Sequence, residues 1–291
     1  MTWESVLAGR ARAAIVHGEN LAVMRAMPPA SVHLVYGDAP YATGDDFTTD
    51  SGEHAYSDRW PSLDAFLDNL RERSAAARDL LTEDGTFVLQ VDPSTSHYVK
   101  VMLDGVFGRA CFDNEIIWRY RRWPVHARRF QRMHDVLFRY RRSAKVEPRW
   151  NQLYDPLAPS TVEAFGNQKQ KHQRAKDGGK WARRVEMTGE VSPGSPMSDV
   201  WEIPIVAPSG SERVDYPTQK PEALANRVIS ACSLQGDVVL DPWCGSGTHV
   251  AVAVSLWRRG IGIDESPVAF RVASGRIARE TQQGNLFARE C

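Results

Sequence analysis

Residues 38–41 combine a carboxylate, a backbone carbonyl and an aromatic ring, the groups needed to hold an amine-bearing base. They read Asp38, Ala39, Pro40 and Tyr41 and follow the largely apolar run 32–36. The Asp38 carboxylate and the Ala39 carbonyl can each accept one hydrogen of an exocyclic amino group, which leaves the nitrogen lone pair free for attack. Tyr41 can stack on the base. Taken alone, an ordinary turn after a strand is the commoner explanation of four such residues.

A second loop has the features of a nucleoside site. The apolar run 238–240 ends in an acidic residue, and a glycine-containing turn then leads into a helical segment. Glycines let the backbone approach a ligand at the carboxyl end of a strand. A further strand, 260–263, ends in a carboxylate that can accept hydrogen bonds from ribose hydroxyls. The third glycine of a redox dinucleotide fingerprint is missing. The candidate residues are Asp241, Gly245, Gly247, Thr248 and Asp264.

Alternating strands and helices must position these loops. Strands are expected at 13–16, 32–36, 86–91, 115–120, 136–140, 238–240 and 260–263, and helices at 20–27, 63–81, 94–106, 222–232, 248–258 and 267–280. This alternation predicts an α/β fold with a doubly wound parallel sheet. A long polar loop is expected from 42 to 60. Periodicity fails from 141 to 215, which predicts an irregular inserted region, and the tail after 281 is expected to fray.

The charge is balanced overall but unevenly distributed. The chain has 291 residues, with 36 Lys and Arg against 36 Asp and Glu. Residues 119–150 contain ten Arg and one Lys against two acidic residues, and 168–184 contain seven basic residues against one. This segregation indicates a polyanionic partner. A solvated charge run with core aromatics is the simpler alternative for part of it.

Composition excludes several classes of protein. No apolar run approaches the roughly 20 residues that a membrane span requires, and the N-terminus lacks the layout of a secretory signal. The four cysteines contain no CxxC pair, which disfavours a structural zinc site and favours a reducing cytosol. We therefore expect a cytoplasmic protein without a membrane segment or a metal.

The order of the motifs resembles the β class of amino-group DNA methyltransferases, which use S-adenosylmethionine. DAPY looks like DPPY, YPTQKP (216–221) like HPTQKP, DPWCGSGT (241–248) like DPFxGSGT, and GIGIDES (260–266) like the following acidic strand. The blocks DGTFVLQVD (84–92), NEIIW (114–118) and HDVLFRY (134–140) lie between the two halves. The resemblance implies a Rossmann-like methyltransferase domain in 1–142 and 213–291, with a target-recognition insert at 143–212.

Residue roles follow from the same resemblance. It implies a catalytic set of Asp38, Ala39, Pro40 and Tyr41. It implies cofactor binding by Gly18, Glu19, Thr218, Lys220, Asp241, Gly245, Gly247, Thr248 and Asp264. The DNA-binding candidates are Arg119, Arg121, Arg122, Arg128, Arg129, Arg132, Lys169, Lys171, Arg174 and Lys180. Three positions depart from the family pattern: Glu19 replaces an aspartate, Ala39 a proline and Tyr216 a histidine.

The implied activity is site-specific methylation of adenine N6 in DNA, with the target base flipped out of the duplex. Asp38 is typical of adenine enzymes in this family, whereas cytosine amino-methylases often carry Ser. Cytosine-N4 methylation and an inactive DNA-binding relative are the alternatives, and a nicotinamide oxidoreductase is disfavoured. Cys244 lies in the cofactor loop, where a small residue suffices, so a nucleophilic role is not expected. A prokaryotic or phage enzyme is implied, with a homodimer or a restriction partner as open alternatives.

Overall fold

The computed structural model describes all residues except 125, 127, 175–180 and 288–291. The chain forms two compact units, one from Met1–Asn151 with Asp199–Cys291, and one from Gln152–Ser198. Each unit is described separately. Among the described helices, none combines the length and apolar character that crossing a membrane requires.

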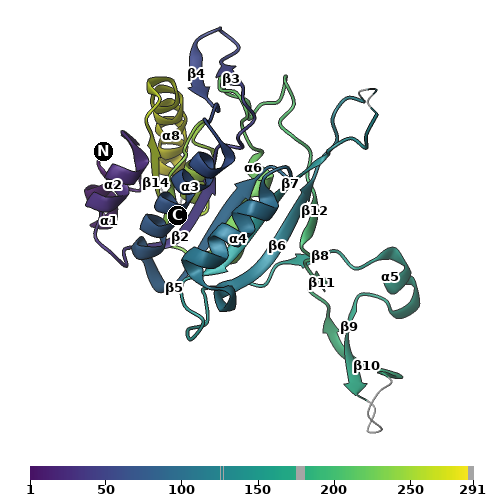
Figure 1. Cartoon of the computed structure of the whole chain (residues 1–291). Coiled ribbons are helices and arrows are strands. Elements are labelled where there is room, and N and C mark those ends of the chain that lie inside the picture. The colour runs from purple at the N-terminus through teal and green to yellow at the C-terminus, as the bar shows by residue number, and fades with distance from the viewer. Residues whose placement is uncertain (125, 127, 175–180, 288–291) are drawn as a thin grey trace. The chain divides into compact units, whose positions relative to one another are not determined.

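An eight-stranded sheet forms the centre of the larger unit (Figure 1). In spatial order it comprises β1 (Ala13–His17), β14 (Arg259–Asp264), β13 (Val238–Asp241), β2 (Val32–Asp38), β5 (Leu81–Val91), β7 (His134–Arg141), β6 (Phe112–Arg119) and β12 (Val200–Glu202). The α/β architecture is as predicted, but the sheet is mixed. β7 runs antiparallel to both neighbours. It follows β6 directly in the chain and pairs with it, as antiparallel neighbours often do.

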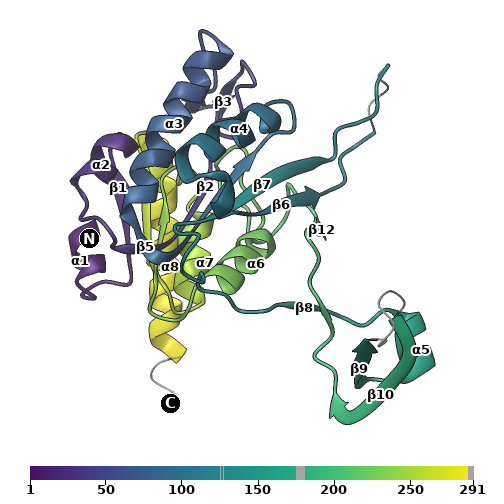
Figure 2. The same ribbon diagram turned by 60° about the horizontal axis from the view of Figure 1, so that its bottom comes forward.

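Helices cover both faces of this sheet (Figure 2). One face carries α1 (Trp3–Leu7), α2 (Asn20–Ala26), α3 (Leu63–Leu80) and α4 (Ser96–Phe107), which is followed by the short helix η1 (Arg109–Cys111). The other face carries α6 (Glu222–Cys232), α7 (Thr248–Ser255) and α8 (Pro267–Phe287). The Ser62 hydroxyl begins α3 by accepting a hydrogen bond from the Ala65 amide at 3.1 Å.

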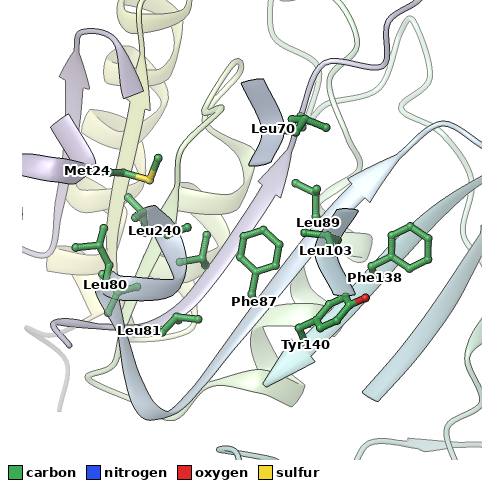
Figure 3. Close-up of a cluster of buried hydrophobic side chains, with 14 of the residues drawn as sticks. Met24, Leu70, Leu80, Leu81, Phe87, Leu89, Leu103, Phe138, Tyr140 and Leu240 are labelled. Atoms are coloured by element: carbon green, nitrogen blue, oxygen red, sulfur yellow. The ribbon is translucent and has the colours of Figure 1, made fainter. Parts of the chain in front are cut away.

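The core between the sheet and the first group of helices is apolar (Figure 3). Phe87 and Leu89 of β5 and Phe138 of β7 pack with Leu70 of α3 and Leu103 of α4, and all five side chains are buried. Continuous apolar stretches on β2 and β5 fit strands that helices cover on both faces. This packing fixes where the strands end, and therefore where the two ligand loops lie.

Three expectations about irregular segments were wrong. The loop expected at 42–60 contains a hairpin of β3 (Asp46–Thr48) and β4 (His54–Ser57). The stretch expected to be irregular contributes β12 to the main sheet, where it pairs with β6. α8 continues to Phe287 instead of fraying after residue 281. β3, β4 and β12 are three or four residues long, too short for periodicity to reveal.

The smaller unit, Gln152–Ser198, also has defined elements. β8 (Tyr154–Asp155) pairs with β11 (Ser195–Pro196), and α5 (Pro159–Phe165) precedes a hairpin of β9 (Gln168–Arg174) and β10 (Trp181–Val191). This unit spans fewer residues than the insert expected at 143–212. Its role in target recognition stays a prediction.

Candidate active site

Three adjacent parallel strands end in carboxylates on one cavity. β14, β13 and β2 are neighbours, and they end at Asp264, Asp241 and Asp38. All three residues line a cavity of about 630 Å³. Because carboxyl ends of parallel strands share one sheet edge, the pairing of β13 with β2 brings the two predicted loops together.

Asp38 has a polar partner at each carboxylate oxygen. Oδ2 lies 2.7 Å from the Lys220 Nζ, and Oδ1 accepts a hydrogen bond of 2.8 Å from the Tyr41 hydroxyl. Burial raises the pKa of the Asp38 carboxyl, while Lys220, Tyr41 and His249 act in the opposite direction. The structure therefore brings together Asp38 and Tyr41 of the first loop with Lys220 of the segment that precedes the second.

A second carboxylate approaches the same Tyr41 hydroxyl. Asp135, near the start of β7, has its Oδ2 3.0 Å from the Tyr41 oxygen. Gln90 of β5 donates through Nε2 to Asp135 Oδ2 at 2.9 Å and to the Tyr41 oxygen at 3.0 Å. Asp135 Oδ1 accepts a hydrogen bond of 2.7 Å from the Tyr120 hydroxyl. Neither Asp135 nor Gln90 was assigned a role from the sequence, although a polar glutamine within the apolar run 86–91 could have indicated a functional residue.

The buried carboxylate of Asp58 holds the backbone after Asp38 in place through hydrogen bonds. It accepts hydrogen bonds of 3.0–3.1 Å from the amides of Tyr41, Ala42 and Thr43 and from the Trp60 indole. Ala42 adopts a left-handed conformation with φ 58°, which a non-glycine residue rarely does. Ala39 stands where the family pattern has a proline, and Asp58 supplies a constraint on this loop that the motif does not contain.

The glycines of the second loop are required by packing. Gly245 and Gly247 have φ values of +49° and +77°. A Cβ on Gly245 would lie 3.0 Å from the Tyr216 ring, and one on Gly247 would lie 2.9 Å from the Ala273 Cβ. Tyr216, which stands where the family has histidine, thus packs against the loop. Substituting either glycine would displace this loop from the cavity edge.

Asp264 is the second acidic group whose pKa is raised. Its Oδ2 accepts a hydrogen bond from the Gly245 amide at 2.8 Å, and its Oδ1 accepts one from the Ser266 amide at 2.9 Å. Burial nevertheless raises the pKa of Asp264 to about 6. Both oxygens keep a lone pair for a further donor.

Most of the other predicted cofactor residues line the same cavity, but several side chains are already engaged. The Glu19 carboxylate caps α2 and pairs with Arg73 at 2.5 Å. Thr248 is buried and accepts a hydrogen bond of 2.8 Å from Arg276. Thr218 has a left-handed φ of 57°, and its side-chain oxygen lies 3.2 Å from the Tyr56 hydroxyl.

The remaining predicted residues differ in whether they line the cavity. Asp241 does so, and its carboxylate lies 2.8 Å from His249 Nδ1. Lys220, Ala39 and Pro40 line the wall, whereas Gly18 and Gly247 do not.

The basic stretch separates into structural and exposed arginines. Arg139 and Arg141 pair with the buried Asp113, and Arg149 pairs with Asp84 and Asp237. These ion pairs show that part of the charge run is structural and is neutralised by acidic partners. They account for part of the excess charge in 119–150.

The loop between β6 and β7, residues 120–133, carries the exposed remainder. Trp123 is 90% exposed and Phe130 is 98% exposed. Arg128 and Arg129 are exposed as well, as is Arg121, whose charge lies 3.8 Å from Glu202. The other predicted arginines have partners: Arg119 pairs with Glu202, Arg132 pairs with Asp92, and Arg122 lies over the Tyr120 ring.

The predicted basic residues of the smaller unit are only partly described. Lys169 pairs with Glu190 at 3.1 Å. Lys171 and Arg174 belong to β9, and Lys180 lies outside the described residues. Their proposed contact with DNA stays a prediction.

Residues 32–274 match the N6_N4_Mtase family model, described as DNA methylase. The type II methyltransferase M.EcaI of Enterobacter cloacae is 29% identical, and the alignment covers 84% of this chain and 64% of that one. The chain thus spans less than two thirds of that relative. The DNA adenine methyltransferase YhdJ of Escherichia coli is 28% identical, with 86% of this chain and 77% of that one covered.

Two solved structures share the fold. The PvuII DNA methyltransferase, described as cytosine-N4-specific, has a TM-score of 0.62 and 13% identity, covering 91% of this chain and 86% of that one. The M1.HpyAVI–SAM complex has a TM-score of 0.54 and 19% identity, covering 91% and 98%. At these identities the likeness shows the fold alone.

Replacing Asp58 should destabilise the first loop. In Asp58→Ala three backbone amides lose their charged acceptor, so we expect the free energy of unfolding to fall by about 2–3 kcal/mol. Chemical denaturation measures this. Asp46→Ala is the matched control in the neighbouring hairpin, because its solvent-exposed pair with Arg59 should contribute little to stability. Equal losses in the two variants would contradict the assignment.

Asp264 should make stability depend on pH. Its pKa in the folded protein, about 6, lies above the ordinary value of 3.8, so the folded state binds more protons between these values. Stability therefore falls as pH rises. Relative to Asp264→Asn, the wild-type free energy of unfolding should drop by about 2 kcal/mol between about pH 4.5 and 7. Parallel pH profiles for the two proteins would rule this out.

Proposed function

The chain belongs to the DNA methylase family whose model matches residues 32–274, and from this premise we propose that it transfers a methyl group from S-adenosylmethionine to adenine N6 in DNA. The observation that carries the proposal is the meeting of Asp38 with Asp241 and Asp264 around one cavity. The aspartate that begins the DAPY motif supports adenine, as does the name of the YhdJ relative. Cytosine N4 is the second candidate, because the N6_N4_Mtase family model covers both kinds of amino-group methylation.

The residues of the cavity fit this cofactor. S-adenosylmethionine carries a sulfonium cation and a ribose, and when bound it supplies an electrophilic methyl group. The carboxylates at the ends of β13 and β14 suit a cation, and Asp264 retains lone pairs for ribose hydroxyls. The volume of about 630 Å³ is in the range of small-ligand sites. Trp243 forms part of the wall, and a Cβ on Gly37 would lie 2.5 Å from its ring, so Gly37 makes room for the indole.

The position of Lys220 supports a binding place for the target amine beside Asp38. Its ammonium nitrogen lies at Asp38 Oδ2 and 4.9 Å from the centroid of the Tyr41 ring. In the proposed reaction, Lys220 gives way to the amino group of the base. Asp38 and the Ala39 carbonyl then accept its two hydrogens, and the Tyr41 ring faces the base. The bond to Asp38 strengthens as the nitrogen becomes positive, which stabilises the transition state.

The β6–β7 loop is the proposed DNA contact. Its exposed arginines can neutralise phosphates, and the exposed Trp123 and Phe130 can fill the gap that a flipped base leaves in the stack. The basic residues of β9 belong to the proposed target-recognition region. A homodimer and a cytoplasmic location stay predictions.

Methyl transfer can be measured with labelled S-adenosylmethionine and unmethylated duplex DNA, followed by digestion and identification of the nucleoside. We expect the product to be N6-methyldeoxyadenosine. Asp38→Ala should lower kcat about 10²- to 10³-fold. Asp64→Ala, an exposed carboxylate on α3, is the matched control. N4-methylcytidine would overturn the choice of base. DNA binding without any product would favour an inactive relative.

Exposed arginines of the loop should determine the salt dependence of DNA binding. Each single replacement of Arg121, Arg128 or Arg129 with Ala should make the negative slope of log K against log salt shallower by about 0.9, because one phosphate contact is lost. Fluorescence anisotropy with a labelled duplex measures this without knowledge of the recognition sequence. Arg71→Ala, an exposed arginine that pairs with Asp68 on α3, should leave the slope unchanged. Equal slopes for all variants would remove the loop from the interface.

A further inference from the structure

Asp135 is a buried carboxylate that touches the active site through a single hydroxyl. Its side chain is 4% exposed. Its Oδ2 lies 3.0 Å from the Tyr41 oxygen, and the same Tyr41 oxygen lies 2.8 Å from Asp38 Oδ1. The motif-based assignment of roles does not include Asp135, and nothing in the proposed transfer uses it.

One proton serves two carboxylates at this point. A tyrosine hydroxyl has a single hydrogen to donate, so Tyr41 can donate to Asp38 or to Asp135, but not to both at once. Gln90 Nε2 donates to the Tyr41 oxygen at 3.0 Å and holds that oxygen in place whichever carboxylate receives the proton. Asp135 is itself held, because the Tyr120 hydroxyl donates to its other oxygen. Rotation about the bond between the Tyr41 ring and its oxygen is the only movement required.

Asp38 gains from such a release. Its Oδ1 accepts from Tyr41 and its Oδ2 contacts Lys220, so each oxygen already shares its charge with one partner. A carboxylate oxygen that already accepts one hydrogen bond binds a second donor less strongly. A second acceptor at 3.0 Å lets the Tyr41 hydroxyl turn away from Asp38 without losing its hydrogen bond.

We propose that Asp135 is a positioning residue that takes the Tyr41 hydrogen bond when the target amine binds, and so frees Asp38 Oδ1 to accept from the amine. This inference rests on the proposed function for its substrate, but the coupling between the two carboxylates exists without substrate. The charged or titratable groups near the pair are Lys220, His249, Tyr36, Tyr56, Tyr120 and Arg122.

The test is a double-mutant cycle of Asp135→Leu and Tyr41→Phe, because leucine is similar in size to aspartate and has no acceptor. In the wild-type background, D135L should lower kcat about 10- to 100-fold with little change in KM, since the Tyr41 hydroxyl stays on Asp38 Oδ1. In the Y41F background, D135L should lower kcat less than 2-fold. Asp104 and Tyr140, joined by a hydrogen bond of 2.7 Å outside the cavity, provide the matched control pair D104L and Y140F. Neither control variant should show the kcat-specific loss.

A second measurement does not depend on methyl transfer. Carbon-13 NMR titration of the Asp38 carboxyl, assigned with Asp38→Asn, should show its pKa lowered in D135L, because the neighbouring carboxylate is gone and Tyr41 donates only to Asp38. If the wild-type protein transfers no methyl group but this shift occurs, the proposed function fails and the coupling stands. An unchanged Asp38 pKa, or equal kcat losses in both backgrounds, would overturn the role of Asp135.

Discussion

Asp38 is largely buried at the end of β2, and the surrounding structure must stabilise the charge of its carboxylate. A carboxylate removed from water is costly unless hydrogen bonds and a cation stabilise its charge. Here Lys220 provides the cation and Tyr41 provides a hydrogen bond. Tyr41 lies three residues after Asp38, whereas Lys220 comes from the C-terminal part of the chain, so the complete site forms only when both parts have folded onto the same sheet. In the proposed reaction these two partners are redirected when Asp38 accepts from the amine, so the network that stabilises Asp38 also takes part in the proposed catalysis.

The sheet solves the problem of bringing those segments together. β2 comes from the N-terminal part of the chain and β13 from the C-terminal part, yet they pair in parallel through Leu34–Val239 and Val35–Leu240. The residues between them add β5, β6, β7 and β12 to the same sheet, and the smaller unit, Gln152–Ser198, interrupts this order just before β12. The intervening strands also bring Gln90 and Asp135 to Tyr41, so the site depends on them as well as on the ends of β2 and β13.

Local patterns predicted the strand ends and the loops but not the contacts between them. Asp38, Asp241 and Asp264 were found because each directly follows an apolar run, a feature that the sequence displays within a few residues. Asp58 and Asp135 reach Tyr41 from 17 and 94 positions away, and no periodicity encodes such a separation. Glu19 shows the converse: its place in a motif suggested a ligand role, while its carboxylate caps α2 and pairs with Arg73. Roles of the individual site residues accordingly stay predictions even where the cavity gathers them.

Further hydrogen bonds connect Asp135 with the loop between β6 and β7. Tyr120, which follows β6, donates to Asp135, and the Arg122 guanidinium donates to the Tyr120 oxygen and lies over its ring. Tyr120 and Arg122 also begin the loop that exposes Trp123 and Phe130. A force on this loop therefore acts on the same hydroxyl that orients Asp135. Because a hydroxyl can donate only one hydrogen bond, Tyr120 donates to Asp135 and only accepts from Arg122. A continuous series of hydrogen bonds therefore connects Asp38 through Tyr41, Asp135 and Tyr120 with Arg122, at the start of the exposed loop.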